Sequence, residues 1–133
     1  MTTLVVAAAI VERKGRFLVT RRQPGVHLEG YWEFPGGKCE PGETLAACLE
    51  REIREELDVS VRVGQELFET MHTYPDRRVA LHFLRCELIG EPTPRLGQTV
   101  RWAPRHELAM LAFPPADREL IRLLMAGVVD GQA

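Results

Sequence analysis

The stretch from Gly37 to Val59 constrains this chain most, because a turn rich in glycine and proline leads directly into a segment dense in acids. The pattern predicts a helix from about Glu43 to Leu57. Three glutamates near its end are spaced i, i+3 and i+4, so they share an arc of about 100° on a helix that advances about 100° per residue. They are Glu52, Glu55 and Glu56. Three acids on one arc can converge on a single ligand.

The position of this arc relative to the apolar side of the helix indicates what the acids bind. Leu49, Ile53 and Leu57 form the apolar stripe, and the acids adjoin it. The opposite side, with Glu50, Arg51 and Arg54, is expected to face solvent. Like charges at a partly buried edge repel one another, and a divalent cation removes that conflict. A ligand set of oxygens without histidine favours Mg²⁺, with Mn²⁺ also possible. The alternative is a solvated acidic face paired with Arg51 and Arg54.

These residues resemble the signature of the Nudix hydrolases. The signature reads G-x5-E-x7-R-E-U-x-E-E-x-G-U, where U is a bulky aliphatic residue, and it is matched from Gly37 to Val59 with one departure. Asp58 stands where the family has glycine, and Asp tolerates the left-handed conformation expected there.

The resemblance also implies roles for single residues. A nucleoside diphosphate linked to another group would be hydrolysed, with divalent ions held by Glu52, Glu55 and Glu56. A backbone carbonyl of the turn at Gly36 and Gly37 would complete the metal shell. Arg51 would orient a glutamate and Glu43 would brace the turn, although both can equally form an ordinary surface salt bridge.

The composition narrows the class of protein. A length of 133 residues with 45% hydrophobic content suits one domain, spanning 1–133. A formal net charge of −2 provides no basic surface for long nucleic acid. Three cysteines without metal spacing indicate reduced thiols in a cytoplasmic protein. The apolar run at 4–10 is too short for a membrane span and is expected to be a buried strand.

Hydrophobic patterning predicts an α/β or α+β fold with one mixed sheet between helices. Strands are expected at 4–12, 17–20, 61–71, 79–86 and 99–103, with a loop at 21–30 and a turn around Gly36 and Gly37. A helical turn at 105–108 and a final helix from Pro115 to Gly127 follow. The Nudix resemblance implies the more definite α/β/α sandwich.

Beyond the signature, the chain is similar to the MutT-type triphosphate pyrophosphohydrolases. The matching segments are T-R-R at 20–22, W-E-F-P-G-G-K at 32–38, Y-P-D-R at 74–77, G-E-P at 90–92 and F-P-P-A-D at 113–117. By position, Arg22 and Arg77 would contact the triphosphate or sugar, His27 and Phe34 would line the base site, and Asp117 would read the base edge. Each also has a purely structural interpretation. Arg22 can be a solvated charge, Phe34 a core aromatic and Asp117 an acid in the first turn of a helix.

Two departures bear on substrate and mechanism. Members that cleave 8-oxo-dGTP have Asn where this chain has Asp117, and an ionised Asp only accepts hydrogen bonds, which suits the amine of cytosine. Leu96 stands where MutT has a glutamate and cannot take a proton. A signature glutamate, or else Glu91, Glu69 or His72, would have to act as the base.

The expected function is Mg²⁺-dependent hydrolysis of a (deoxy)nucleoside triphosphate to the monophosphate and pyrophosphate. A damaged nucleotide such as 8-oxo-dGTP is the expected substrate, as in enzymes that clear modified nucleotides from the pool. CTP or 5-methyl-dCTP is the rival substrate. A non-catalytic nucleotide-recognition module is the alternative from another class, and hydrolysis of ADP-ribose, dinucleotides or capped RNA is a third possibility. The sequence leaves open whether the chain is a monomer or a homodimer.

Overall fold

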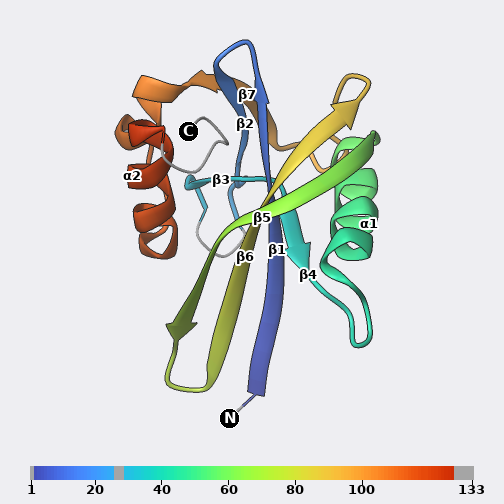
Figure 1. The fold of residues 1–133 in the computed structure, drawn as a ribbon, viewed down its shortest axis with the longest axis vertical. Helices are drawn as coiled ribbons and strands as arrows, with labels where there is room; N and C mark the ends of the chain where they lie inside the picture. The colour runs from blue at the N-terminus through green and yellow to red at the C-terminus, as the bar shows by residue number, and fades with distance from the viewer. Residues whose placement is uncertain (1, 26–28, 128–133) are drawn as a thin grey trace.

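The computed structural model describes residues 2–25 and 29–127. One helix lies on each side of a long, twisted group of strands (Figure 1). In chain order the elements are β1 (Thr2–Arg13), β2 (Arg16–Arg21), β3 (Trp32–Glu33), β4 (Gly36–Lys38), α1 (Leu45–Leu57), β5 (Ser60–Thr73), β6 (Arg77–Ile89), β7 (Thr99–Pro104), the 3-10 helices η1 (Arg105–Met110) and η2 (Pro115–Asp117), and α2 (Arg118–Ala126).

The strands form a mixed seven-stranded sheet in which β1 is central. Its main path runs β3-β2-β1-β6-β5, while β4 pairs with β1 and β7 pairs with β2. β1 and β6 pair in parallel, with Ala7 opposite His82, and the remaining pairs are antiparallel. Because parallel neighbours need a crossover, the segment between β1 and β6 includes α1, which covers one face of the sheet.

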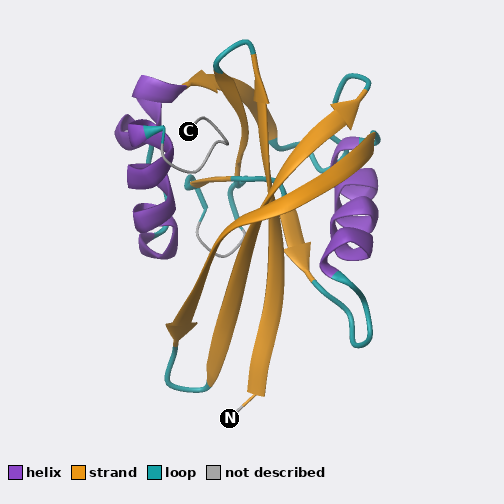
Figure 2. Ribbon diagram, in the orientation of Figure 1, coloured by secondary structure: helices purple, strands orange, loops and turns teal. Residues whose placement is uncertain are grey.

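Both faces of β1 are buried, as its continuous apolar run predicted. Ala7, Ala9 and Val11 pack with Leu49, Ile53 and Leu57 of α1. The alternating residues Ala8 and Ile10 pack with Leu120 and Leu124 of α2. Successive side chains of a strand point to opposite faces, so two separate cores form on one strand. The result is the predicted α/β/α sandwich (Figure 2).

The predicted strands are confirmed, with β5 and β6 longer than expected because each extends along the other. α1 begins at Leu45, since the Thr44 hydroxyl accepts a hydrogen bond from the Ala47 N–H at 3.0 Å. Asp58 adopts the expected left-handed conformation, with φ 52° and ψ 45°. At the other end of the chain, Pro115 opens a short 3-10 helix, and α2 itself begins at Arg118.

The segment around Gly36 differs from the prediction. It was expected to be a turn, yet Gly36–Lys38 form a short strand antiparallel to Val6–Ala8 of β1. Pairing of this kind depends on a partner that is distant in sequence, and local patterning gives no sign of it. Within the described part of the chain, no helix has the length and apolar character needed to cross a membrane.

Candidate active site

The two glycines of β4 allow the end of α1 to approach the sheet closely. Gly36 has φ 151°, and a Cβ placed there would collide with the carbonyl oxygen of Ala7. A Cβ on Gly37 would collide with the carboxylate of Glu52. Each glycine is therefore required for a different reason. Gly36 packs against the backbone of Ala7, and Gly37 packs against the carboxylate of Glu52.

Two of the three signature glutamates turn inward, as predicted. The side chain of Glu52 is only 16% exposed, and Glu56 is half-buried, with one carboxylate oxygen 3.4 Å from the Gly36 N–H. The prediction was wrong for Glu55, whose side chain is 60% exposed. Glu55 lies about 200° around the helix from the buried Ile53, so it points toward solvent.

Arg51 was expected on the solvated side of α1, and this was wrong. Its guanidinium turns toward β4, because it pairs with both oxygens of Glu43 at 2.8 and 2.9 Å. It also donates to Glu52 at 2.8 Å and to the Lys38 carbonyl at 3.0 Å. Glu43 in turn accepts from the Glu40 N–H at 2.8 Å. The turn and Glu52, the first of the three signature acids, are thus held by one planar guanidinium, a geometry that arginine provides and lysine does not.

This arrangement also affects the acidity of Glu43. The hydrogen bonds from Arg51, followed by that from the Glu40 N–H, lower the pKa of Glu43 to about 2. The carboxylate stays ionised throughout the physiological pH range, so the bracing of the turn is permanent. Glu43 and Arg51 thus make the contacts that bracing the turn and orienting Glu52 would need, and their roles in catalysis stay predictions.

A cavity of about 310 Å³ joins the acidic helix end to the predicted base site. Gly36, Gly37 and Glu56 line one part of it, and Phe34 and Asp117 line another. The other lining residues are Val6, Ala7, Ala8, Arg22, Glu33, Lys38, Tyr74, Leu81, Phe83, Pro114 and Ala116. A smaller adjoining space of about 210 Å³ is bordered by Thr20, Arg22, Gln23, Glu33, Glu56, Leu96 and Gln98. One connected region thus offers both carboxylates and aromatic walls.

A larger cavity of about 450 Å³ lies between η1 and α2. Its walls are mostly apolar, with Leu108, Phe113 and Ile121 among them, and no carboxylate of the described residues lines it. Hard cations are usually held by carboxylates, so the acidic cavity remains the candidate active site.

Glu56 is the carboxyl whose ionisation is most perturbed in the cavity. Burial, together with the neighbouring charges of Glu33 and Glu52, raises the pKa of Glu56 to about 8. The pKa of Glu52 is also raised, chiefly by burial. Carboxyls this close together do not ionise easily at the same time, because their negative charges repel one another. A bound cation would neutralise those charges and remove the conflict.

The residues present fit a hard divalent cation. Glu52 and Glu56 offer carboxylate oxygens beside Gly36 and Gly37, whose backbone carbonyls are further oxygen ligands, and Glu55 stands at the exposed edge. Within residues 2–25 and 29–127 the three carboxylates do not form a compact cluster, so binding an ion requires them to draw together. An all-oxygen ligand set with like charges suits Mg²⁺ or Mn²⁺.

The burial of Glu56 predicts a distinctive dependence of stability on pH. Because its folded pKa of about 8 exceeds the ordinary 4.5, the stability that the neutral carboxyl contributes is present below pH 4.5 and is lost as pH rises through 8. Glu56→Gln should remove that loss, which is on the order of a few kcal/mol. Chemical denaturation of the metal-free protein at pH 6 and pH 8.5 measures it.

Glu50→Gln is the matched control for this measurement, because Glu50 lies on the same helix and is exposed. It should keep the parent's pH dependence. Added Mg²⁺ should stabilise the parent at pH 8.5 more than it stabilises Glu56→Gln. A Glu56→Gln protein that loses stability with pH as steeply as the parent would contradict the assignment of this effect to Glu56.

Glu33 belongs to the site and was not predicted. Its carboxylate pairs with Arg22 at 3.0 Å and lies close enough to Glu56 and Asp117 to raise the pKa of each. Burial raises the pKa of Glu33 itself, although Arg22 opposes the rise. Its place inside W-E-F-P-G-G-K, next to Phe34, was the one available signal, but sequence alone does not show which way a side chain points.

The candidates for a general base outside the signature lie elsewhere. Glu91 pairs with Arg13 at 2.9 Å, and Glu69 lies 3.5 Å from His82. His72 packs against the ring of Tyr74. None of the three lines the acidic cavity, whereas Leu96 borders the space next to Glu56. Glu33 and Glu56 are therefore the carboxyls placed to exchange a proton in this region.

The predicted nucleotide-contacting residues are only partly brought together. Arg22, Phe34 and Asp117 line the cavity. Arg77 does not line it, being exposed at the start of β6 with its guanidinium 5.9 Å from the centre of the Tyr74 ring. His27 lies outside the described residues. Phe34 is only 4% exposed and stacks on Phe113 at 5.1 Å, so it is also a core aromatic.

Asp117 is one of two buried polar residues in the described chain, at 7% exposure. Its side chain makes no capping hydrogen bond to α2, so the helix does not account for it. Burial, together with the charge of Glu33, raises the pKa of Asp117 to about 7. At neutral pH this carboxyl is present in both forms, one that accepts hydrogen bonds and one that also donates.

The fold and this acidic cavity define the class of the chain. It is an α/β/α sandwich in which helix α1 carries its acids beside the diglycine strand β4. A profile of the NUDIX domain matches residues 6–123. The chain belongs to the Nudix hydrolase family. It is 39% identical over 123 residues to an 8-oxo-dGTP diphosphatase of Haemophilus influenzae, covering 90% of each chain. It is also 33% identical over 127 residues to a CTP pyrophosphohydrolase of Escherichia coli, covering 95% of this chain and 94% of that one.

A solved structure agrees with the sequence comparison. The solution structure of the E. coli ORF135 protein superposes with a TM-score of 0.87 at 32% identity, covering 100% of this chain and 96% of that chain. Similarity across the full length confirms both the fold and the family expected from the signature.

Proposed function

We propose that this chain is a divalent-metal-dependent pyrophosphohydrolase of (deoxy)nucleoside triphosphates that releases the monophosphate and pyrophosphate. The supporting observation is the single cavity that is lined both by Glu56 with Gly36 and Gly37 and by Phe34 with Asp117. The first group suits metal-bound phosphates and the second suits a base. The relative named 8-oxo-dGTP diphosphatase supports a modified purine triphosphate as substrate.

Each part of the site has a proposed role. Glu52, Glu55 and Glu56 with a carbonyl of Gly36 or Gly37 would hold Mg²⁺ or Mn²⁺, which neutralises phosphate charge and lowers the pKa of a bound water. Arg51 holds Glu52 in place. Arg22 faces the cavity beside Glu33 and provides positive charge for the phosphates.

Water is added across the phosphoanhydride, so one proton must leave the nucleophile and the oxygen of the leaving phosphate group must be neutralised. Glu33, Glu56 and Asp117 are the cavity carboxyls with raised pKa values. Because Asp117 is assigned to the base, Glu33 and Glu56 are the two proposed to take the first proton. A general base is most effective when its pKa lies near the working pH. The pKa of Glu56, about 8 in the metal-free protein, meets that condition only while no cation is bound. Glu33, which is not among the proposed metal ligands, is the better candidate in the loaded enzyme.

A cytidine triphosphate is the second candidate substrate, and Asp117 favours it. The ionised carboxylate accepts from the exocyclic amine of cytosine, whereas a guanine O6 needs a donor. The relative named CTP pyrophosphohydrolase is consistent with this alternative.

A panel of triphosphates tests the proposal. 8-oxo-dGTP, dGTP, CTP, dCTP and 5-methyl-dCTP are compared by kcat/KM with and without Mg²⁺, and pyrophosphate release is measured directly, because discrimination lies in that ratio. Turnover that requires Mg²⁺ and yields pyrophosphate is expected. Binding without turnover for every triphosphate would instead indicate a recognition module.

The Asp117→Asn variant tests how the base is read. The amide donates and accepts at every pH, so kcat/KM for 8-oxo-dGTP should rise relative to CTP by about tenfold, the value of one good hydrogen bond. In the parent, the preference for CTP over 8-oxo-dGTP should increase as pH rises through about 7, where Asp117 ionises. The variant should lack that pH dependence. An unchanged substrate ratio in the variant would contradict a base-reading role.

A further inference from the structure

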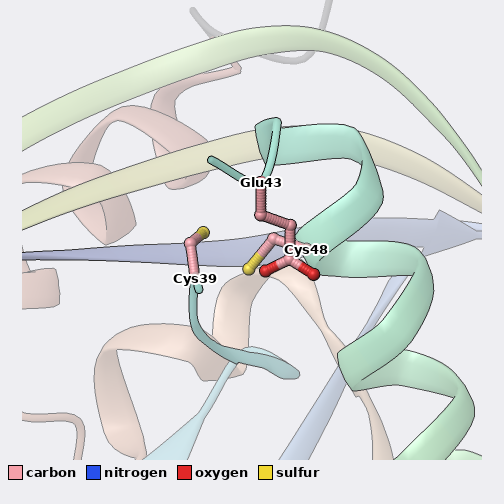
Figure 3. Close-up of side chains that lie close together, drawn as sticks. All are labelled: Cys39, Glu43 and Cys48. Atoms are coloured by element: carbon pink, nitrogen blue, oxygen red, sulfur yellow. The ribbon is translucent and has the colours of Figure 1, made fainter. Parts of the chain in front are cut away.

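A second group of metal-ligating side chains lies at the start of α1, outside the acidic cavity. Cys39 follows β4, Glu43 belongs to the turn, and Cys48 is in the first part of α1 (Figure 3). One ligand atom from each, two sulfurs and a carboxylate oxygen, lie within 4.8 Å of one another. None of these residues lines the cavity that carries Glu56.

The ligand chemistry of this group differs from that of the signature acids. Thiolates are soft ligands that select Zn²⁺ and related thiophilic ions, while Mg²⁺ prefers oxygen. A tetrahedral zinc ion with Zn–S bonds of about 2.3 Å places two sulfurs about 3.8 Å apart. The two sulfurs therefore need to close by no more than about 1 Å from the observed limit of 4.8 Å, and each sulfur and the carboxylate oxygen by no more than about 1.3 Å.

The surroundings of Glu43 orient it for this task. Arg51 and the Glu40 N–H hold its carboxylate from outside the group, as partners beyond the ligands do in many metal sites. A carboxylate has about four lone-pair positions. The hydrogen bonds from Arg51 and from the Glu40 N–H use three of them, so one remains for a metal. A dication bound by two thiolates and one carboxylate has a net charge of one negative unit together with its ligands. Arg51 lies beside this group and offsets the charge.

Access and burial are also suitable. Cys48 is fully buried, whereas Cys39 is half-buried and opens the group to solvent. Three protein ligands leave a fourth position that water can fill. The other compact group, formed by Glu66, Glu69 and His82, has both glutamates exposed and offers no sulfur. It does not have the character of a thiophilic site.

We propose that Cys39, Glu43 and Cys48 bind one thiophilic divalent cation of the zinc class, in addition to the hard cation expected at the signature acids. Binding replaces the two thiol protons, which pass to solvent, and involves no oxidant. The Cys48 sulfur lies 3.6 Å from the Gly37 carbonyl oxygen, so the ion would tie the turn to α1 directly beside the diglycine strand. It should stabilise the folded protein, since the unfolded chain does not hold these ligands together.

Cobalt is a suitable probe because Co²⁺ takes zinc sites and its thiolate bonds absorb light. The full-length protein is freed of metal, reduced with a phosphine and titrated with Co²⁺ in excess Mg²⁺, which occupies the oxygen ligands. A thiolate-to-cobalt charge-transfer band that saturates at one equivalent is expected, and Zn²⁺ should remove it. Zn²⁺ should also raise the melting temperature.

Variants locate the site. Cys39→Ser should weaken Zn²⁺ binding by more than about 100-fold, because loss of even an outer partner costs 10-fold to 100-fold. Cys86→Ser is the matched control, since Cys86 is a buried thiol near Leu84 and outside the group. It should keep the band and the affinity. Cys39 is the better position to change because Cys48 is fully buried, and circular dichroism confirms that each variant folds.

Three results would overturn the proposal. The first is the absence of a thiolate band in the reduced parent. The second is equal Zn²⁺ affinity in Cys39→Ser and Cys86→Ser. The third is Zn²⁺ binding that disappears in Glu52→Gln but persists in Cys39→Ser, because the ion would then occupy only the signature acids. All three readouts are independent of turnover, so failure of this site would leave the proposed hydrolase activity untouched.

Discussion

Glu56→Gln is expected to lower kcat for the preferred triphosphate by at least about 100-fold, the loss typical of one preorganised charged group at a reacting centre. Glu56 lies beside the Gly36 N–H in the cavity and is held there at the cost of burying its charge. The amide keeps the shape of the side chain but cannot neutralise a cation. The same variant should be more stable than the parent at alkaline pH in the absence of metal, which combines a gain in stability with a loss of activity.

Steady-state pyrophosphate release, measured over a range of Mg²⁺ concentrations, checks this result. Glu50→Gln again serves as the control, because Glu50 is an exposed glutamate on the same helix. It should keep both kcat and the Mg²⁺ dependence within about twofold, as is usual for exposed positions. If Glu56→Gln retains most of its activity, the metal and phosphate end of the cavity is misassigned.

Gly37→Ala is expected to produce the second large loss, about 100-fold in kcat/KM, in a protein that still folds. The added methyl group meets the carboxylate of Glu52, which is the mobile end of a side chain and can swing away. Displacing a carboxylate that is proposed to bind the metal by about 1 Å can cost 100-fold in rate. The melting temperature should change little, because no backbone contact is broken.

Gly36→Ala, one residue earlier, should have the opposite character. Its methyl group meets the backbone of Ala7 in the central strand, and the residue sits at φ 151°, so the strand pairing itself must shift. Overpacking of this kind costs about 1–3 kcal/mol or more. Circular dichroism melts and kinetics of both variants separate the two effects. Equal destabilisation by both substitutions would contradict the distinct roles assigned to the two glycines.

Local spacing was sufficient to predict the helix and the placement of two of its three signature acids. The i, i+3, i+4 pattern placed Glu52 and Glu56 at the edge of the core because helix geometry is the same wherever a helix packs. The left-handed Asp58 followed from its place at the helix end, and the burial of β1 on both faces followed from its unbroken apolar run. The family resemblance supplied the sandwich, which the structure and comparisons confirm.

The tertiary structure decided which groups meet and how far each is removed from water. Helical spacing could not show that Arg51 turns inward, since its partner Glu43 lies in the preceding turn. Nor could it show that Gly36–Lys38 pair with β1, or that Glu33 stands near both Glu56 and Asp117.

The pKa values of Glu56 and Asp117 come from burial and from charges brought near by the fold, and both depend on contacts between distant parts of the chain. The sequence by itself therefore determined the chemistry available on α1. Only the folded chain determined the surroundings in which that chemistry operates, because burial and proximity are properties of packed strands and helices.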